Sequence, residues 1–415
     1  MSQHDALTLL ALTLGAFIMP LLAERIGWFN APCEMLYGMA IANLLPDMRF
    51  NGAFISTLSE FGFLLLLFIA GLEIDFDALR HQAARSLFTA ALAALGIQAV
   101  ALGLTVLLRL PAMFGLILGA LSVTVLMAIL HEMGLVRSPF GQRLLVVGAL
   151  GEFISILGVT AYDLIYSYGV DWQLGVAAAK LLALLILGYV GLRGLMALAS
   201  TRSGAVRRLL ALRDTSELGV RAALALMLCF AATAYILRVE AILATFIAGA
   251  ISSFAFRGRN HVTEKLTTMG QGFFLPIFFI YVGAQVRFVD LLSPVTLTLM
   301  GALVIGIFGV RLAAMPLLRL AGIRWNMALP ATMLLSAPLS LIVAIAQVGV
   351  RLGAIGEATA SAALGASIVC ATLYPLLARP FLLRHARSEA RQAAPGALSL
   401  DVAPIDGASV SEVSA

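Results

Sequence analysis

Charged side chains are scarce in this sequence, and so are cysteines. Asp, Glu, Lys and Arg make up 12% of the 415 residues, hydrophobic residues make up 61%, and the mean hydropathy is +1.01. Soluble globular domains carry about 25% charged residues, so this composition excludes a soluble domain and predicts a polytopic membrane protein. The cysteines are Cys33, Cys229 and Cys370, which lie in separate apolar segments without metal-ligand spacing. A disulfide framework and a zinc site are therefore not expected.

Motifs of soluble and catalytic proteins are also missing. No strand–GxGxxG–helix unit follows the last apolar segment, so no nucleotide-binding regulatory domain is expected in this chain. No His or Cys lies at membrane depth beside a serine in a nucleophile–base arrangement, which argues against an intramembrane enzyme, and no cofactor is expected. The first apolar run, 6–22, lacks a basic flank and a cleavage-like site, so we interpret it as a retained helix.

Apolar runs of about 20 residues, the length that crosses a bilayer, recur along the chain. Thirteen spans are predicted, at 6–22, 33–45, 55–74, 87–108, 112–131, 143–167, 174–199, 217–237, 239–256, 268–286, 294–318, 327–349 and 358–384. With the N-terminus outside, six Lys and Arg residues fall on the outer side and 20 on the opposite side. Because basic residues are retained in cytoplasmic loops, we expect an outer N-terminus and a cytoplasmic C-terminus. This asymmetry also explains the excess of 27 Lys and Arg over 22 Asp and Glu without a nucleic acid partner.

The two halves of the chain resemble each other. The similar segments are YGMAIANLL (37–45) and FIAGAISSF (246–254), LSEFGFLLLLFIAGLEIDF (58–76) and MGQGFFLPIFFIYVGAQVRF (269–288), and GALSVTVLMAIL (119–130) and SAPLSLIVAIA (336–346). Gly71 thus corresponds to Gly283, and Gly38 to Gly249. Because a single span, the seventh, separates the two halves of six spans each, the second copy enters the membrane from the opposite face, as in the inverted repeats of secondary transporters. Similar composition alone is the alternative explanation.

These spans form one predicted transmembrane domain, 1–387. Repeat one is expected at about 5–168, a linking helix at about 173–199 and repeat two at about 216–385. Residues 388–415 are rich in Ala, Ser and Pro without apolar periodicity, so a disordered cytoplasmic tail is predicted there.

Two ionisable residues lie deepest in the predicted spans. Glu152 lies about nine residues into span 6, and Arg311 about seventeen into span 11. Each charge costs on the order of 3 kcal/mol at the bilayer centre, so such residues normally face a cavity or each other. Gly148, Gly151 and Ser155 lie on turns adjacent to Glu152, which lets this helix approach a neighbour and leaves the carboxylate in a small polar pocket. A buried structural ion pair is the other interpretation.

Small and hydroxyl-bearing residues interrupt spans 5 and 12. Span 5 contributes Ser122 and Thr124, and span 12 contributes Ser336, Pro338 and Ser340. If Pro338 breaks its helix, freed carbonyls can coordinate a cation, and the exposed helix ends carry opposed partial charges. Such hydroxyls also commonly bond the carbonyl four residues earlier in their own helix, which would make them structural.

Arg311 has two candidate roles beside such a break. Its charge would neutralise a negative helix end, or it would pair with a carboxylate such as Glu73 or Glu152. Glu73 lies near the cytoplasmic end of span 3, where it would attract cations, pair with Arg311 or extend to the membrane surface. The sequence leaves these alternatives open.

These residues together resemble the monovalent cation:proton antiporter family, the sodium/hydrogen-exchanger-like transporters that include the bacterial potassium/proton efflux branch. The resemblance covers roughly residues 5–385. LLLLFIAGLEIDFDALR (64–80) looks like the family's third-helix signature, and GFFLPIFFIYVGAQV (272–286) is similar to its counterpart in the second half. GALSVTV looks like the fifth-helix crossover, and Arg311 falls where the family carries a Lys or Arg.

The resemblance implies an all-α polytopic membrane protein of 13 transmembrane helices. Two inverted repeats of six helices would flank a linking helix 7, with crossed discontinuous helices 5 and 12. It also implies a homodimer in a bacterial inner membrane, in which spans 4–6 and 11–13 form a mobile core and the other spans a scaffold. Two departures stand out: this chain has Gly151-Glu152 where the family usually pairs an acidic or amide residue with Asp, and Ser340 near the family's acidic or Gly-rich motif in helix 12.

The expected function is exchange of Na⁺ or K⁺ for protons at Glu152. The neighbouring ion or proton ligands expected are Ser122, Thr124, Ser155 and Ser340. Desolvation favours the neutral form of a buried carboxylate, so a proton and a dehydrated cation would compete for it. A single carboxylate predicts one cation per proton and electroneutral exchange. The alternatives are an organic-anion symporter that uses helix N-termini and Arg311, and a non-transporting sensor with a decayed ion site.

Overall fold

Helices make up every regular element in the part of the chain that the structure describes. The computed structural model describes residues 3–393 except 27, 29, 46–49, 51, 73–83, 137, 238–240, 256–259, 287, 288, 290–292 and most positions between 170 and 217. The helices of the first half are α1 (Gln3–Ile26), α2 (Asn30–Leu44), α3 (Ala53–Leu72), α5 (Ala84–Leu107), α6 (Ala112–Gly119), α7 (Thr124–Glu132) and α8 (Pro139–Tyr168). Those of the second half are α11 (Leu218–Leu237), α12 (Ala241–Ala255), α13 (Asn260–Met269), the π-helix η1 (Gly270–Phe274), α14 (Leu275–Ala284), α16 (Pro294–Ala313), α17 (Met315–Leu320), α18 (Trp325–Leu335), α19 (Leu339–Arg351) and α20 (Glu357–Ala393).

The helices confirm a multi-pass membrane protein. Eight of them are long and apolar enough to cross a membrane, and α18 with α19 forms a ninth candidate bent by 42°. Every predicted span except the seventh coincides with one described helix or with adjoining ones, whereas the seventh lies mostly outside the described residues. The total of thirteen is not confirmed, because α2 and α12 have 15 residues each, and α6 and α7 have only 8 and 9.

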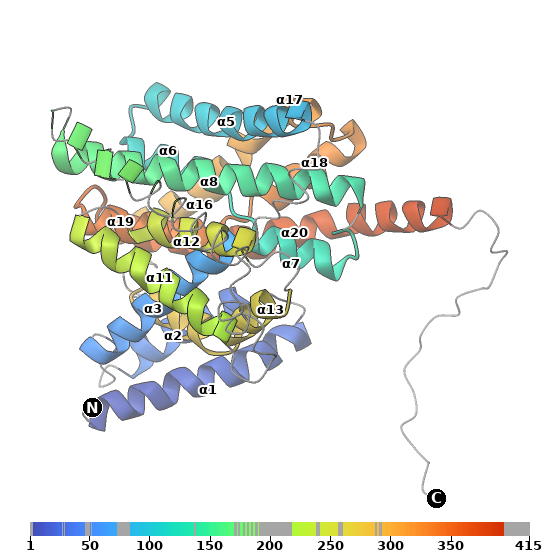
Figure 1. Ribbon diagram of the computed structural model, residues 1–415. Coiled ribbons are helices and arrows are strands. Elements are labelled where there is room, and N and C mark those ends of the chain that lie inside the picture. The colour runs from blue at the N-terminus through green and yellow to red at the C-terminus, as the bar shows by residue number, and fades with distance from the viewer. Residues whose placement is uncertain are drawn as a thin grey trace, which may run out of the picture.

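The two ends of the described chain lie at opposite ends of the molecule. In Figure 1, α1 begins at the left, whereas α20 runs to the right-hand edge. The helix α20 continues to Ala393 and so includes the first six residues, 388–393, of the segment predicted to be a disordered tail, while 394–415 lie outside the described residues.

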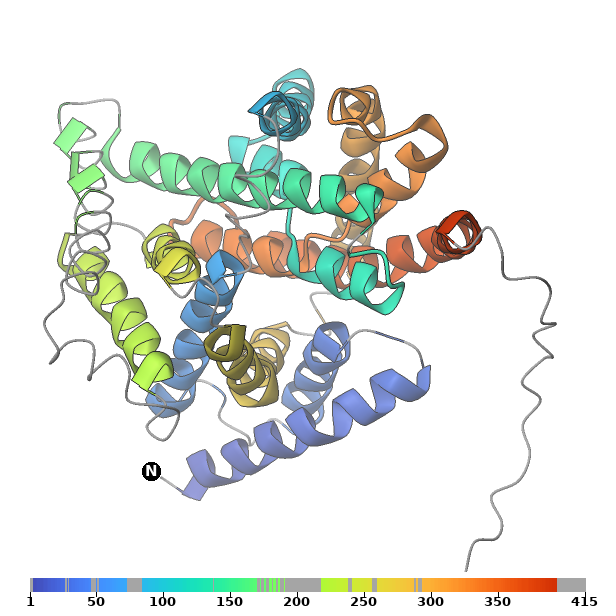
Figure 2. The same cartoon turned by 45° about the vertical axis from the view of Figure 1, so that its right-hand side comes forward.

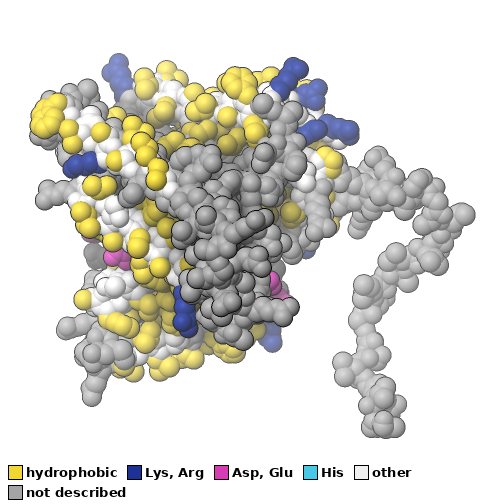
Figure 3. Space-filling model, viewed as in Figure 1, with side chains coloured by type: hydrophobic (Ala, Val, Ile, Leu, Met, Phe, Trp, Pro, Cys, Tyr) yellow, Lys and Arg dark blue, Asp and Glu magenta, His cyan; other side chains and the backbone are white. Residues whose placement is uncertain are grey.

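The helices form two bodies. In Figures 1 and 2, α5 to α8 and α16 to α20 lie together in the upper body, while α1 to α3, α11, α13 and α14 make up the lower one. Helix α12 lies at the height of α19 but packs mainly against α3 and α11, so it belongs to the lower body. The bodies touch where α12 contacts α8 and where α2 contacts α20. The upper body contains the described helices of spans 4–6 and 11–13, which the family resemblance assigns to the core, and the lower body contains described helices that it assigns to the scaffold. Figure 3 shows that hydrophobic side chains cover much of the described surface on the face in view, as expected of helices that contact lipid.

Two glycine crossings hold the lower body together and reveal the inverted repeat. A Cβ on Gly38 would lie 1.9 Å from the carbonyl oxygen of Ile280, and one on Gly283 would lie 2.0 Å from that of Met35, so α2 and α14 touch backbone to backbone. The same reciprocal contact joins α3 and α12 at Gly71 and Gly249. The sequence repeat pairs Gly38 with Gly249 and Gly71 with Gly283. Exchanging the two halves therefore carries one crossing onto the other.

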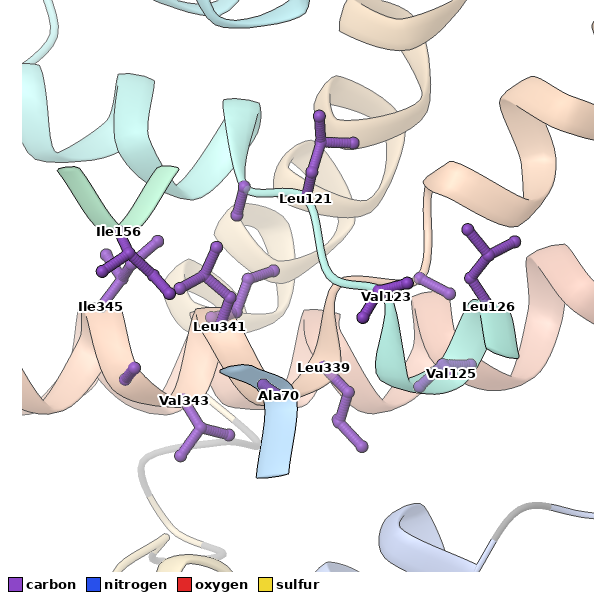
Figure 4. Packing of buried hydrophobic residues seen from close by; sticks show 14 of the residues in the cluster. Ala70, Leu121, Val123, Val125, Leu126, Ile156, Leu339, Leu341, Val343 and Ile345 are labelled. Atoms are coloured by element: carbon purple, nitrogen blue, oxygen red, sulfur yellow. The ribbon is translucent and has the colours of Figure 1, made fainter. Parts of the chain in front are cut away.

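Two broken helices meet in the upper body, which confirms the predicted discontinuities. Helices α6 and α7 are separated by residues 120–123, and α18 and α19 by 336–338, with Pro338 immediately before α19. Figure 4 shows the extended link with Leu121 and Val123 running beside α19, whose Leu339 and Leu341 pack in the same cluster. Apolar side chains thus surround the point where the backbone leaves helical geometry.

Candidate functional site

Glu152 lies where α8 presses against the break in span 5. Glu152 is only 3% exposed. The close approach predicted from the glycines is present, because a Cβ on Gly151 would lie 2.2 Å from a methyl of Leu121, and one on Gly148 would lie 2.9 Å from a methyl of Leu126. The small residues of α8 therefore bring the carboxylate of Glu152 up to the buried, non-helical backbone between α6 and α7.

The carboxylate accepts two hydrogen bonds at the N-terminus of α7. The backbone N–H of Val123 donates to Oε2 at 3.0 Å, and the hydroxyl of Ser122 donates to Oε1 at 3.1 Å. The first N–H groups of a helix have no partner within it, and the helix dipole favours negative charge there. The break in span 5 thereby supplies both a donor and a positive end for Glu152.

Ser340 extends this contact to the second broken helix. Its Oγ lies 2.8 Å from the Oγ of Ser122. A hydroxyl carries one hydrogen, which Ser122 gives to Glu152, so Ser340 is the donor in the serine pair. The repeat aligns Leu121-Ser122 with Leu339-Ser340, and these equivalent residues meet at the crossing. The result is a hydrogen-bonded chain from α19 through Ser122 to the carboxylate.

Ser155 lies one turn after Glu152, and its hydroxyl is fully engaged. It donates to the carbonyl of Gly151 at 2.7 Å, and it accepts from the backbone N–H of Leu121 at 3.3 Å and from Nε2 of Gln98. One hydrogen and both lone pairs are thus in use. Ser155 therefore ties α8 to the break and to α5.

Arg311 binds carbonyl oxygens at the C-terminal ends of both broken helices. The residue is 1% exposed, and its guanidinium donates to the carbonyls of Leu335 at 2.7 Å, Leu118 at 2.8 Å and Ala120. It also donates to Ile307 on its own helix at 2.7 Å. These carbonyls lie at the negative ends of α18 and α6. Two roles were predicted for Arg311, and its contacts with described residues fit the neutralisation of negative helix ends.

The remaining predicted positions divide into two groups. Ser336 bonds the carbonyl of Thr332 at 2.8 Å, as hydroxyls in helices commonly do. Thr124 is the first residue of α7, but its side chain lies outside the described part of the structure. Glu73 also lies outside the described residues.

Gln98 is a site residue that was not predicted from the sequence. This residue lies in the middle of α5, is 7% exposed, and places its side-chain oxygen against Gly119 at the end of α6. That oxygen has no hydrogen-bond donor among the described groups. The available signal was a neutral amide in an otherwise apolar span, which a search for charges overlooks.

The sequence matches a known protein family. A family model described as "Sodium/hydrogen exchanger, transmembrane" matches residues 13–384, which is most of the chain. The chain belongs to the sodium/hydrogen exchanger family. This is a family of transporters, and the crossing of broken helices falls inside the matched region.

Relatives within the sodium/hydrogen exchanger family are distant in sequence. The chain is 24% identical to the putative Na(+)/H(+) antiporter YjbQ of Bacillus subtilis (strain 168), over 94% of this chain and 66% of that protein, so it spans about two thirds of the relative's length. It is 23% identical to the probable Na(+)/H(+) antiporter 3 of Methanocaldococcus jannaschii, over 90% of this chain and 96% of that protein. A third relative is the Na(+)/H(+)-K(+) antiporter GerN of Bacillus cereus, 24% identical over 64% of this chain and 68% of that protein.

A solved structure shares the fold. The sodium proton antiporter MjNhaP1 from Methanocaldococcus jannaschii, determined at pH 8, matches with a TM-score of 0.63 and 14% identity. The match covers 92% of this chain and 98% of that one. The all-helical architecture expected of the family is therefore confirmed over nearly the whole chain.

Proposed function

We propose that the protein is a secondary-active antiporter that exchanges a monovalent cation, Na⁺ or K⁺, for protons, and that both occupy Glu152 by turns. The observation that carries this proposal is the buried carboxylate at the crossing of two broken helices, where Ser122 and Val123 hold its oxygens. An ionised carboxylate offers about four lone-pair sites. Two remain for a cation or a proton.

The chemistry at this site is competition for one negative charge. A cation binds only the ionised carboxylate, so its binding displaces the proton. The oxygens of Ser122 and Ser340 are the neighbouring ligands supported by distance, and Thr124 remains a candidate because it begins α7. Ser155 acts by positioning the break, since its hydrogen-bonding capacity is used by Gly151, Leu121 and Gln98.

Coupling follows from the cost of moving charge through an apolar barrier. Glu152 is neutralised by either ligand, and the core can then slide past the scaffold, whereas the bare carboxylate resists the movement. The guanidinium of Arg311 stays fixed on its carbonyls and adds no mobile ligand. One carboxylate thus exchanges one cation for one proton, and the cycle moves no net charge.

The arrangement disfavours an organic-anion symporter. The positive end of α7 is occupied by the carboxylate of Glu152, and the donors of Arg311 are directed to four backbone carbonyls. A substrate carboxylate would have to displace one of them. A decayed sensor site is also disfavoured, because Glu152 retains two well-directed donors.

The membrane context forms part of the proposal. The loop asymmetry of Lys and Arg supports an outer N-terminus and a cytoplasmic C-terminus in a bacterial inner membrane. The apolar outer face of α1, where Leu14, Phe17 and Leu21 are 46%, 70% and 51% exposed, suits lipid or a second copy in a homodimer.

Reconstitution tests the function directly. Purified protein in vesicles that enclose a pH dye should change the lumenal pH when Na⁺ or K⁺ is added outside. Glu152→Gln should abolish the response because an amide carries no charge to exchange, whereas Glu152→Asp should retain a slower response. Exchange that persists in Glu152→Gln, or a parent protein that responds to neither cation, contradicts the proposal.

A further inference from the structure

A cavity of about 270 Å³ lies between the two bodies, away from Glu152. Its scaffold walls come from α3, α11, α12 and α14, and its core wall is the C-terminal part of α19. It has room for several water molecules, and therefore for a hydrated monovalent cation. The polar residues lining it are Ser56, Ser59, Glu60, Tyr235, Tyr281, Gln347 and Arg351.

The cavity carries one charge of each sign, and each belongs to a different body. Glu60 is exposed on α3, and its carboxylate accepts a hydrogen bond from the hydroxyl of Tyr235 on α11. Arg351 is exposed in the last turn of α19. The carboxylate of Glu60 therefore belongs to the scaffold, while the guanidinium of Arg351 belongs to the core helix that carries Ser340.

One stripe of α19 leads from the cavity to the ion site. Residues four, seven and eleven positions apart lie on one face of a helix, so Ser340, Ala344, Gln347 and Arg351 follow a single line. Ser340 contacts Ser122 at one end, and Gln347 and Arg351 line the cavity at the other. At about 1.5 Å per residue, Gln347 lies about 10 Å along the helix from Ser340.

Apolar side chains separate the cavity from the ion site. Leu64 and Phe278 of the scaffold line the cavity together with Val348 of the core, and all three are buried. Ala344, fully buried, continues the same stripe toward Ser340. The cavity is thus a polar vestibule that is closed from Glu152 by a short apolar layer between the bodies.

The vestibule falls on the expected outer side. The topology places the start of span 3, the end of span 8, the start of span 9 and the ends of spans 10 and 12 outside, and these are the segments that line it. In Figure 1, α19 lies toward the end of the molecule at which α1 begins.

We propose that this cavity is the outer access site for the transported cation, and that Glu60 concentrates cations there while Arg351 opposes their entry. This inference rests on the proposed antiport function. A fixed charge changes the local concentration of a monovalent ion according to its sign, and the effect weakens as salt screens it. The two residues must therefore act in opposite directions, and only on cations that arrive from the outer side.

Sided transport assays test the proposal. Right-side-out and everted membrane vesicles that enclose a pH dye present opposite faces of the protein to added Na⁺ or K⁺. At alkaline pH, where proton competition is weak, Glu60→Gln should raise the KM for outer cation about threefold, and Arg351→Gln should lower it by a similar factor. Neither should change the KM measured from the inner side, and both outer-side effects should shrink when choline chloride raises the ionic strength.

Matched variants on the same predicted face serve as controls. Glu357→Gln at the start of α20 and Arg109→Gln after α5 remove exposed charges that do not line the cavity. Glu60→Asp should keep the KM of the parent, which separates loss of charge from loss of fold. An unchanged outer KM in Glu60→Gln, the same shift on both sides, or a shift only from the inner side overturns the proposal. A parent protein that exchanges from neither side overturns the proposed function itself.

Discussion

At the scale of single residues, Ser122 controls the balance between the charged and neutral forms of Glu152. Its hydroxyl donates to the ionised carboxylate at 3.1 Å, so its removal disfavours the charged form relative to the protonated one. A hydrogen bond to a charged group contributes about 1.5–3 kcal/mol, and about 1.4 kcal/mol corresponds to one pH unit. Ser122→Ala should therefore shift the pH profile of cation-driven exchange to more alkaline values by about one to two units.

The same assay on Ser340→Ala and Ser367→Ala gives the comparison. Ser340 bonds Ser122 and not the carboxylate, so the alkaline shift should be smaller. Ser367 is equally buried but bonds Leu364 of its own helix, so its loss should leave the profile in place. A shift of the pH profile to more acidic values in Ser122→Ala would contradict the assignment of Ser122 as the donor to Glu152.

Single residues were predictable where charge made them conspicuous. Glu152 and Arg311 stand out in apolar spans, and the structure buries both beside the helix breaks. The partners of Arg311 were only partly predictable, because backbone carbonyls have no signature in sequence. Gln98 was not predicted because a neutral amide costs less to bury than a charge, and so is a weaker signal of a functional site in an apolar span.

At the scale of elements, Arg311 fastens α16 to the ends of α6 and α18. Replacing it by Met leaves buried carbonyls of Leu118, Ala120 and Leu335 without this donor, and each unsatisfied group costs about 1–3 kcal/mol. Arg311→Met should lower the midpoint of thermal unfolding in detergent strongly, and Arg311→Lys, which keeps a charged donor, should lower it less. Arg319→Met, at an exposed position on α17, is the matched substitution and should have little effect. Equal midpoints for Arg311→Met and Arg319→Met would refute this fastening role.

The glycine crossings provide a second prediction for the elements. Gly38→Ala and Gly249→Ala each place a Cβ about 2 Å from a backbone carbonyl oxygen, so α2 must move from α14 and α12 from α3. Such overpacking typically costs about 1–3 kcal/mol, and both variants should unfold at lower temperature. Gly103→Ala and Gly301→Ala meet nothing within 4 Å and should be neutral or slightly stabilising. If all four variants unfold alike, the crossings are not close contacts.

Most elements could be predicted from apolar length, and the break at Pro338 from the residue that causes it. The pairing of Gly38 with Gly283 could not be predicted, because the repeat indicates which positions are equivalent and not which ones touch. Hydropathy alone also could not determine the exact number of spans. The short helices α2 and α12 cross α14 and α3 at glycines, so close packing and not helix length determines their position.

At the scale of the whole molecule, competition at one carboxylate predicts how transport depends on pH. Below the pH at which Glu152 is half protonated, each unit of acidification should raise the KM for the cation about tenfold, while the maximal rate changes little. Initial rates in reconstituted vesicles over a range of cation concentration and pH provide the measurement. A KM that is independent of pH, combined with a falling maximal rate, would indicate separate proton and cation sites.

The most direct test of the shared site is proton release on cation binding. Purified protein in a weakly buffered detergent solution, held at a pH where Glu152 is protonated, is titrated with Na⁺ or K⁺ while a pH indicator records the released protons. The account predicts about one proton per bound cation in the parent protein, because one carboxylate changes occupant, and none in Glu152→Gln. Cation binding without proton release in the parent, or equal release in Glu152→Gln, would contradict it.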